Sequence, residues 1–470
     1  MKTTMAVVLL TVVTVMGMAQ PPSVQWMRTY GLNGDDRPYC VQQTTDGGYV
    51  VLGVSHSFNI YQWDYYLLRI DSVGDTLWTR RYRERGDQWG YCVQQTTDGG
   101  YILAGDGSDM SMIKIGINGE VEWARRHGGG RSILQTSDEG YIMAGTTYSA
   151  ETFSDFYLVR TDSVGDTLWT REYGTNANEP AYCIKQTIDG GYILAGYSQP
   201  LGYSSDFYLI KTDSMGDTLW TNIIIGEYFE EAYSVLQTND GGYIASGTAY
   251  SSPGYGVAFC AAKVTPGGEL EWMRYYGGDG GERGYSICEA PDGNYVVAGG
   301  TNSFGAGWFD VYLVKINSAG DTLWTCTYGA STYEIANCIQ TTSDGGYIIA
   351  SEFYDSEHNI LLIKTEPDTS RLPVGFIPGY HAPSKYGLQV PYPNPFNSST
   401  TISYEVPVME RVYIALYNLL GRRVSTLQDH TVAAGVHEVV WNAGDLPSGI
   451  YFVRMQAGEF VQTRKVVLLK

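Results

Sequence analysis

The chain has 470 residues, enough for a large domain and a smaller one. It carries 30 Lys and Arg against 50 Asp and Glu, for a formal net charge of −20. This charge argues against nucleic acid and anionic lipid as partners. Gly (57) and Tyr (39) are abundant, which suits many short strands joined by tight turns.

Residues 1–19 have the pattern of a secretory signal peptide. Lys2 precedes an apolar stretch over residues 5–18, and Gly17-Met18-Ala19 offers a small-residue cleavage site. The stretch is shorter than the roughly 20 residues that cross a bilayer, and no later segment is long and apolar enough to cross one. No Cys follows the cleavage site, so a lipid anchor is not expected. We therefore expect an exported chain without a membrane span.

A tetrapeptide, Asp-Gly-Gly-Tyr, recurs along most of the chain. It begins at Asp46, Asp98, Asp189, Asp240 and Asp344, and close variants begin at Asp138 and Asp292. Successive copies lie about 50 residues apart, except that Asp98 and Asp138 are 40 apart. A near-constant period of this size predicts a repeat architecture.

Each repeat predicts four short antiparallel strands. In one copy these are residues 182–187, 192–196, 207–212 and a strand that opens at 218–221, with tight turns at 189–191 and 213–217. The second and third strands are apolar on both faces, so both sides of each sheet must be covered. Four antiparallel strands per repeat are typical of a propeller blade. The expected fold is all-β, with a seven-bladed β-propeller over residues 24–366.

The ends of the repeat region complement each other. The first six repeats end in a strand that carries a Trp, and the seventh does not. The six tryptophans are Trp78, Trp123, Trp169, Trp220, Trp272 and Trp324. Residues 24–31 closely match residues 270–277, so the N-terminal strand is expected to complete the seventh blade and to remove its free edge. We expect each Trp to be buried, and Ala-Gly pairs in the second strands to mark close backbone approaches.

The seven cysteines are expected to be buried free thiols. Cys40, Cys92, Cys183 and Cys338 each lie six residues before a repeat Asp, where the other copies have Ser132, Ser234 and Ser286. Equivalent positions of different repeats are not expected to meet easily within the short reach of a disulfide. Cys260, Cys288 and Cys326 have no recurrent position, and only chance proximity would pair them.

The antiparallel order places both kinds of tight turn on one face of the repeat domain. The opposite face collects links of variable length that are rich in aromatic residues, and variable loops on a rigid scaffold commonly bind ligands. The candidate ligand-binding residues are Tyr61, Trp63, Trp89, Tyr148, Tyr203, Tyr255, Trp308 and Tyr354, with Phe304 beside them. The alternative is that they are ordinary solvated loop residues.

Metal and catalytic motifs are not evident. The Asp-Ser-x-Gly-Asp turns at 71–75, 162–166 and 213–217 lack the ligand count of a calcium loop, and each Asp is expected to cap its own turn. They resemble the Asp-box of sialidases only with a one-residue displacement. No His pair, Gly-x-Ser-x-Gly or phosphate loop is present, so no metal or cofactor is expected. Carboxylate pairs for glycoside hydrolysis remain open, because only the fold brings them together.

After the repeats the pattern changes. Residues 367–391 are rich in Pro, Gly and Ser and predict a linker. Strands are then expected near 400–406, 411–418, 436–441, 449–455 and 460–469. This pattern predicts a small Ig-like β-sandwich over residues 392–470.

The C-terminal segment carries a series of motifs. They begin with the Pro-Asn-Pro-Phe sequence and continue to the basic C-terminal strand. The motif residues are Pro393, Asn394, Pro395, Phe396, Gly421, Gly435, Gly449, Tyr451 and Lys465. The segment resembles the C-terminal sorting domain of the type IX secretion system of Bacteroidetes and related Gram-negative bacteria. An Ig-like accessory module without sorting activity is the alternative.

The resemblance implies a route and a partner. The Sec machinery takes the signal peptide, and the outer-membrane translocon recognises the C-terminal domain. In the family this domain is commonly cleaved, and the cargo is released or attached to the surface. The repeat domain would then be a passenger, monomeric, with a binding or adhesion role toward a glycan or protein. An extracellular enzyme acting on polysaccharide and a structural surface protein without a discrete site are the alternatives.

Overall fold

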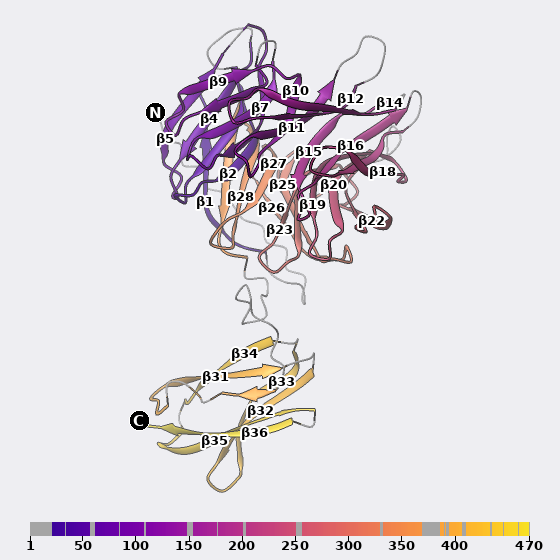
Figure 1. Ribbon diagram of the computed structural model, residues 1–470. Helices are drawn as coiled ribbons and strands as arrows, with labels where there is room; N and C mark the ends of the chain where they lie inside the picture. The colour runs from indigo at the N-terminus through magenta and orange to yellow at the C-terminus, as the bar shows by residue number, and fades with distance from the viewer. Residues whose placement is uncertain are drawn as a thin grey trace. The chain divides into compact units, whose positions relative to one another are not determined.

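The computed structural model contains two compact units, Met1–Asp368 and Thr369–Lys470 (Figure 1). It describes residues 21–32, 34–56, 62–83, 85–107, 110–147, 154–175, 177–200, 204–250, 256–329, 332–368, 386–389, 391, 394–406, 410–432, 435–444, 446–458 and 460–469. The described residues form strands and turns and contain no helix. The expected signal peptide, residues 1–19, lies outside them.

The first unit is built of antiparallel sheets that follow one another along the chain. The first sheet contains β2 (Asp36–Gln43), β3 (Tyr49–Ser55), β4 (Asp64–Ile70) and β5 (Thr76–Tyr82). The second contains β6 (Trp89–Gln95), β7 (Tyr101–Asp106), β8 (Met112–Ile115) and β9 (Val121–Arg125). The third contains β10 (Gly129–Gln135), β11 (Tyr141–Thr147), β12 (Asp155–Thr161) and β13 (Thr167–Tyr173).

The later sheets repeat this order. The fourth contains β15 (Ala181–Gln186), β16 (Tyr192–Pro200), β17 (Asp206–Thr212) and β18 (Thr218–Ile224), with the short β14 (Ala177–Asn178) also paired to β16. The fifth contains β19 (Phe229–Gln237), β20 (Tyr243–Tyr250), β21 (Val257–Val264) and β22 (Leu270–Tyr276). The sixth contains β23 (Glu282–Glu289), β24 (Tyr295–Thr301), β25 (Asp310–Ile316) and β26 (Thr322–Tyr328). The all-β repeat of four-stranded antiparallel sheets expected from the sequence is confirmed.

The seventh sheet combines the two ends of the unit. It contains β27 (Tyr333–Thr341), β28 (Tyr347–Tyr354), β29 (His358–Thr365) and, as its fourth strand, β1 (Val24–Tyr30). β1 pairs with β29 from Val24 opposite Thr365 to Tyr30 opposite Ile360. The hydrogen bonds of Tyr30 and Tyr328, described next, show that β1 contacts the neighbouring sheets as the fourth strands of the other sheets do.

A tyrosine near the end of the fourth strand ties each of several sheets to the next. The Tyr82 hydroxyl donates to the Gly119 carbonyl at 2.9 Å, and Tyr173 and Tyr276 make the same bond to Gly216 and Gly320. Tyr30 of β1 donates in the same way to the Gly74 carbonyl of the first sheet, at 2.7 Å. Tyr328 of the sixth sheet donates to the Pro22 carbonyl at 2.8 Å, just before β1.

The first strand of each sheet lies inside and the fourth lies outside (Figure 1). First strands of successive sheets contact each other throughout the unit, and β27 also contacts β2. The second and third strands between them are buried on both faces, as expected; every residue of β3 and β4 is buried. Gly145 illustrates the backbone crowding, because an added Cβ would lie 1.7 Å from the Gly129 carbonyl oxygen.

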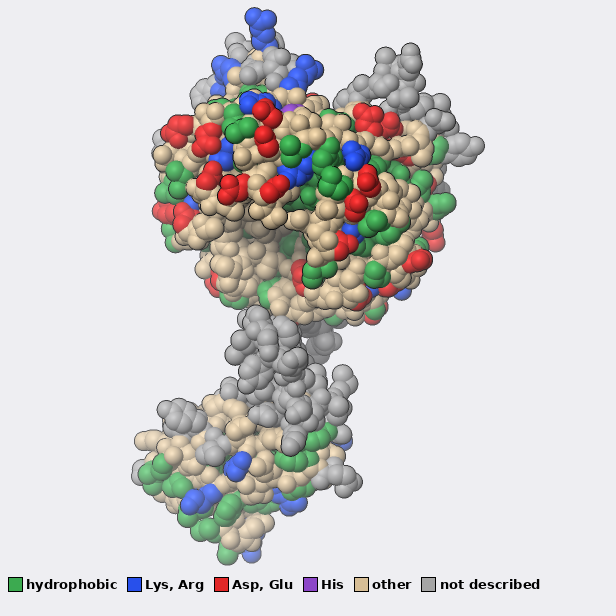
Figure 2. All heavy atoms as spheres, viewed as in Figure 1, with side chains coloured by type: hydrophobic (Ala, Val, Ile, Leu, Met, Phe, Trp, Pro, Cys, Tyr) green, Lys and Arg blue, Asp and Glu red, His purple; other side chains and the backbone are tan. Residues whose placement is uncertain are grey.

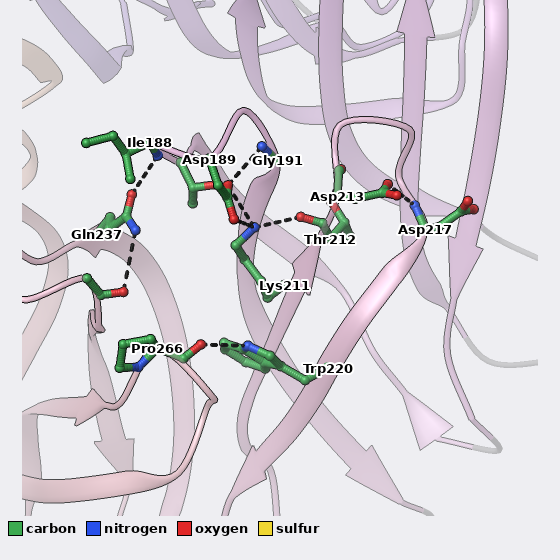
Figure 3. Close-up of polar contacts among 12 residues, drawn as sticks. Ile188, Asp189, Gly191, Lys211, Thr212, Asp213, Asp217, Trp220, Gln237 and Pro266 are labelled. Carbon is green, nitrogen blue, oxygen red and sulfur yellow. Dashed lines mark hydrogen bonds and ion pairs between the residues drawn. The ribbon is translucent and has the colours of Figure 1, made fainter.

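The recurrent tryptophans differ from the expectation of full burial. Trp324 is buried, whereas Trp78, Trp123, Trp169, Trp220 and Trp272 are half-buried. They lie on the fourth strand of their sheets, where the ring packs on the turn of the following sheet and, for Trp78, Trp123 and Trp169, beneath an Arg side chain. Trp220, for example, packs on the turn at Gly268 and donates through Nε1 to the Pro266 carbonyl at 3.0 Å (Figure 3).

Every repeat contains an ion pair between its two hairpins. The Asp of the Asp-Gly-Gly-Tyr turn, or of its variants, pairs with a buried cation of the third strand at 2.5 to 2.9 Å. The pairs are Asp46–Arg69, Asp98–Lys114, Asp138–Arg160, Asp189–Lys211, Asp240–Lys263, Asp292–Lys315 and Asp344–Lys364. In Figure 3, Lys211 reaches both Asp189 and the Thr212 carbonyl. The pair holds the turn on the sheet.

The second unit has two sheets. One contains β30 (Gly387–Leu388), β31 (Ser399–Val406) and β34 (Gly435–Asn442). The other contains β33 (Arg423–Val432), β32 (Glu410–Asn418), β35 (Gly449–Ala457) and β36 (Phe460–Leu468). A single core joins the sheets, with Ile402 and Trp441 from the first and Leu416 and Val453 from the second. β33 was not expected from the sequence.

Two residues of the predicted linker, residues 367–391, are held by the two units. Asp368 is buried in the first unit, 2.9 Å from Lys315 Nζ. Leu388 belongs to β30 and is buried in the second unit, where its N–H donates to Gln462 Oε1 at 2.7 Å. The Pro- and Gly-rich composition did not reveal these two contacts.

Candidate functional site

One position recurs at the inner edge of every sheet of the first unit. It is the residue just before the small Cys or Ser of the first strand, and the pairing register shifts there in each sheet. A β-bulge redirects the side chain of the extra residue. The residues are Tyr39, Tyr91, Arg131, Tyr182, Tyr233, Tyr285 and Asn337, and we call them the inner girdle.

The inner-girdle side chains contact one another from sheet to sheet. Ring centroids lie 5.1 Å apart for Tyr39 and Tyr91, 4.9 Å for Tyr182 and Tyr233, and 5.2 Å for Tyr233 and Tyr285. Arg131 bridges the two tyrosine groups, with its Cζ 3.8 Å from the ring centroid of Tyr91 and 5.7 Å from that of Tyr182. Asn337 Nδ2 donates to the Pro38 carbonyl at 2.8 Å. These contacts link all seven sheets.

The inner girdle is half-buried, so solvent reaches it. Burial raises the pKa of Tyr39, Tyr182 and Tyr285 above the ordinary value for tyrosine. The phenols therefore stay protonated well above neutral pH and keep their hydrogen-bond donors. Because each ring is fixed by its neighbours, the surface is ordered before any ligand arrives.

Charged residues lie two positions before the inner girdle, on the same side of the strand. Glu231 accepts a hydrogen bond from the Tyr233 hydroxyl. Burial raises the pKa of Glu231, and this hydrogen bond opposes the shift. Arg37 and Arg283 occupy the same position of their repeats, and Arg283 Cζ lies 5.4 Å from the Phe309 ring centroid. Aromatic and charged groups thus lie together at the inner edge of the sheets.

Contacts connect three of the predicted ligand-binding residues, Trp63, Trp89 and Tyr354, to the inner girdle and the charged residues beside it. Trp63 and Trp89 pack with ring centroids 5.2 Å apart, and Trp89 lies 6.3 Å from Tyr39. Arg37 lies over Trp63 at 5.3 Å and pairs with Glu352 at 3.4 Å.

Two further contacts reach the third predicted residue. Glu352 also contacts His358 Nδ1, and the His358 ring lies 4.7 Å from that of Tyr354.

The other predicted residues are not brought to this place. Trp308 is 84% exposed, and its backbone N–H donates to the Thr332 carbonyl. Phe304 packs on Tyr312 instead, at 5.6 Å. Tyr61, Tyr148, Tyr203 and Tyr255 lie outside the described residues.

The inner girdle itself was missed in the sequence. Its signal was the residue directly before the Cys or Ser slot, which is Tyr in five of the seven repeats.

The cysteines next to the inner girdle serve packing between sheets. Cys40 Sγ lies 3.6 Å from the Val93 carbonyl of the next sheet, and Cys338 Sγ lies 3.8 Å from the Val41 carbonyl. All seven cysteines are free, as expected. Cys183, Cys260 and Cys288 are buried, whereas Cys40, Cys92, Cys326 and Cys338 are only half-buried. The small Cys or Ser residue of the first strand thus packs against the neighbouring sheet without a covalent bond.

The opposite face carries the two kinds of turn. Asp213 Oδ1 accepts the N–H groups of Met215 at 2.8 Å and Asp217 at 2.9 Å, so the carboxylate caps its own turn (Figure 3). Among the described residues, no group of three or more His, Cys, Asp or Glu side chains is arranged to hold a metal ion.

Buried carboxylates near the inner opening are used by the chain itself. Asp36 accepts the Leu32 N–H at 2.6 Å, and Glu179 and Glu230 accept the N–H groups of Thr175 and Tyr228 at 2.5 and 2.8 Å. They hold the links between sheets. Asp and Glu side chains also spread over the face of the first unit seen in Figure 2, consistent with the net charge of −20.

In the second unit the motif residues fasten the last strand. Asn394 bonds β36 twice, with Nδ2 donating to the Lys465 carbonyl at 3.1 Å and Oδ1 accepting the Val467 N–H at 2.9 Å. Phe396 is buried against Trp441, with centroids 4.8 Å apart, and Trp441 packs on Tyr451 at 5.4 Å. The side chain of Asn394 thus makes two hydrogen bonds to the backbone of β36, as the backbone of a neighbouring strand would.

The remaining motif residues have distinct places. Gly421 forms the β32–β33 turn with φ of 70°, and Gly435 and Gly449 begin β34 and β35. Lys465 is exposed on β36, Pro395 is exposed, and Pro393 lies outside the described residues.

The pattern of the secretion system C-terminal sorting domain matches residues 391–469. This segment is a type IX sorting domain. The sorting domain implies interaction with the type IX machinery and marks the protein as secreted or displayed at the cell surface. Within the described residues, no helix has the length and apolar character needed to cross a membrane.

Among curated proteins, none matches this sequence. Three solved structures illustrate its distant structural likenesses. PorZ, a surface component of the type IX secretion system of Porphyromonas gingivalis, is 11% identical, with a TM-score of 0.46, over 94% of this chain and 60% of PorZ. Sqt1 from Chaetomium thermophilum is 11% identical, with a TM-score of 0.44, over 70% of this chain and 85% of Sqt1. A puromycin hydrolase is 10% identical, with a TM-score of 0.46, over 83% of this chain and 62% of the hydrolase.

Proposed function

We propose that the protein is a secreted binding or adhesion protein whose first unit is a passenger and whose sorting domain directs its export. The passenger, residues 24–366, is a seven-bladed β-propeller closed by β1, and residues 1–19 are its signal peptide. The pairing of β1 with β29 and the bond from Tyr30 to Gly74 support closure. The passenger acts as a monomer, with its ligand site on the face that carries the links between the second and third strands of each sheet, such as β3–β4.

The inner girdle carries the binding proposal. It offers half-buried tyrosine rings, fixed by mutual contact, beside the Trp63–Trp89 pair. Fixed aromatic surfaces with a few convergent polar groups are typical of ligand sites. Glycans and proteins are the ligand classes that such a surface suits.

A glycan array probed with the purified chain tests this role directly. We expect binding that is lost with Trp89→Ala and kept with Trp308→Ala, since only Trp89 packs on the inner girdle. Absence of any ligand on the array and in pull-downs from cell-surface material would contradict a binding role.

A second candidate is an enzyme that acts on extracellular polysaccharide. One observation favours it: Glu231 is bonded to Tyr233 of the inner girdle, and Glu352 pairs with Arg37, two positions before Tyr39 of the inner girdle. Paired carboxylates are the groups that glycoside hydrolysis needs. Release of reducing sugar that disappears with Glu231→Gln would favour this candidate over binding alone.

Export is tested with a truncation and a fusion. Removing residues 386–470 is expected to leave the passenger in the periplasm, and residues 386–470 fused to a periplasmic reporter are expected to carry it out of the cell. The cut precedes β30 because Leu388 belongs to the sorting-domain core. Normal secretion of the truncated chain would reject the sorting role.

A further inference from the structure

We propose that the inner girdle binds an acidic glycan, with Arg131 pairing with a uronic acid carboxylate. This inference rests on the proposed binding function and names its ligand class. It is carried by two observations, the environment of Arg131 and the half-buried tyrosine rings, and the charge of the surrounding protein limits the form of the ligand.

Arg131 occupies an inner-girdle position at which the other repeats have Tyr or Asn. No carboxylate among the described residues lies within ion-pair distance of it, whereas Arg69 pairs with Asp46 and Arg37 pairs with Glu352. Its guanidinium is instead held between the rings of Tyr91 and Tyr182. Stacking on aromatic faces leaves the N–H groups at the guanidinium edge to bind an anion. Arg131 is therefore a cation fixed by aromatic rings, without an ion-pair partner in the part of the chain that the structure describes.

The neighbouring tyrosines suit the rest of a sugar. A pyranose has apolar C–H faces and polar edges, and the phenol ring offers an apolar face and a polar tip. Burial raises the pKa of Tyr39, so its hydroxyl stays protonated and can donate a hydrogen bond to a sugar oxygen. Glu231, beside Tyr233, is placed to accept a sugar hydroxyl. Stacking and hydrogen bonding thus act around one cation.

The protein's charge limits the form of the ligand. A net charge of −20 repels a long polyanion lying across the surface. A short acidic oligosaccharide or a chain end that reaches the inner girdle meets Arg131, and Arg283 lies beside Tyr285 on the same opening. The inferred ligand is therefore an oligosaccharide with a uronic acid at the bound end.

Calorimetry with the full mature chain tests the inference. The probes are an α-1,4-linked galacturonic acid tetrasaccharide and the neutral maltotetraose, in 50 mM and 500 mM NaCl. We expect the acidic probe to bind more tightly than the neutral one, and only its affinity to fall at high salt. Arg131→Gln is expected to weaken the acidic probe roughly 10- to 100-fold.

Arg171→Gln is the matched control. Arg171 also stacks on an aromatic ring, 5.2 Å from the Trp169 centroid, but it lies on the outer strand β13, so this variant is expected to bind normally. Tyr182→Leu should weaken both probes, since it removes a stacking ring. If Arg131→Gln unfolds, the salt dependence of the unaltered protein still decides the point.

The outcomes separate this inference from the function on which it rests. Equal binding of both probes without salt dependence would overturn the role of Arg131 and leave glycan binding intact. Failure of both probes, combined with a ligand on the array, would overturn the acidic glycan alone. Failure of both probes and of the array would overturn the proposed function as well.

Discussion

Lys211 Nζ lies 2.9 Å from Asp189 Oδ2, and the Lys211 side chain is 3% exposed whereas that of Asp189 is 53% exposed (Figure 3). The buried member of the pair is thus the cation, on the third strand of its sheet. Its carboxylate partner sits on the turn between the first and second strands. The same pairing in every repeat makes it a structural element of the first unit.

Neutralising Asp189 is expected to destabilise the protein more than removing Lys211. Asp189→Asn leaves a buried ammonium without its counter-charge, at a cost of about 1–3 kcal/mol. Lys211→Met replaces the buried cation by an apolar chain of similar length and should cost less. Asp217→Asn, at an exposed ion pair with Arg171, is the control and should change stability by at most about 1 kcal/mol. Urea denaturation measures all three, and the opposite order would contradict the pairing.

The ion pairs also predict a dependence on acid. The hydrogen bond from Lys263, followed by that from Thr238, lowers the pKa of Asp240 to about 2 from 3.8. A folded-state pKa below the unfolded value stabilises the protein above pH 3.8, and this stabilisation is lost as the pH falls toward 2. The melting-temperature difference between the native protein and Asp240→Asn should therefore be constant at neutral pH and vanish near pH 2. A difference that does not change with pH would exclude the linkage.

The first strand should matter more to stability than its length suggests. Deleting residues 23–31 removes the pairing with β29 and exposes the edge of the seventh sheet. We expect a large fall in melting temperature. Tyr30→Phe removes only the bond to Gly74 and should cost about 0.5–1.5 kcal/mol, as should the matched Tyr276→Phe. An unchanged melting temperature after the deletion would refute closure by β1.

The buried thiols should be silent in the folded state. Burial raises the pKa of Cys183 and Cys260, and no cysteine is in a disulfide. A reducing agent is therefore expected to leave the melting temperature unchanged. In the folded protein a thiol reagent should react with the half-buried Cys92, whose pKa is lowered to about 7 chiefly by its hydrogen bond with Cys40, before it reacts with Cys183 and Cys260, and it should titrate all seven cysteines in denaturant. Loss of stability on reduction would reveal a disulfide.

In the sorting domain, Asn394 should be more important than its neighbour Asn397. Asn394→Ala removes two hydrogen bonds to β36 and is expected to destabilise the domain by about 1–3 kcal/mol. It should also reduce the amount of protein secreted. Asn397 is exposed, so Asn397→Ala is the control and should secrete normally. Equal secretion of both variants, measured in the culture medium, would show that the motif does not act through this contact.

The sequence allowed the repeat, its strands and the sorting domain to be predicted, because each has a local signal. The strand expected at 182–187 corresponds to β15, and that at 411–418 corresponds to β32. β33 was missed because most of its sequence is polar, so its alternation is weak; Val424 and Leu427 are the described side chains of β33 that pack on the core. A strand at a sheet edge needs little apolar surface.

The candidate site could be predicted only in part. Trp63 and Trp89 were chosen as aromatic residues of variable links, and the structure brings them together. Arg131 was not chosen, because it is a single cation at a position where Tyr prevails. Its place in a candidate site becomes evident only in the fold, where Tyr91 and Tyr182 of the neighbouring sheets lie on either side of it. The buried cations such as Lys211 were hidden for a similar reason, since their partners lie across a turn rather than beside them in the chain.

The make-up of the seventh sheet has a consequence for how the protein is made. Its outer strand, β1, leaves the ribosome near the beginning of synthesis, and β29 leaves more than 300 residues later. A contact between such distant parts of the chain is slow to form. The early strand must therefore wait, unpaired, until nearly all of the first unit has emerged. Any factor that protects the unpaired β1 from aggregation during that interval would raise the yield of folded protein.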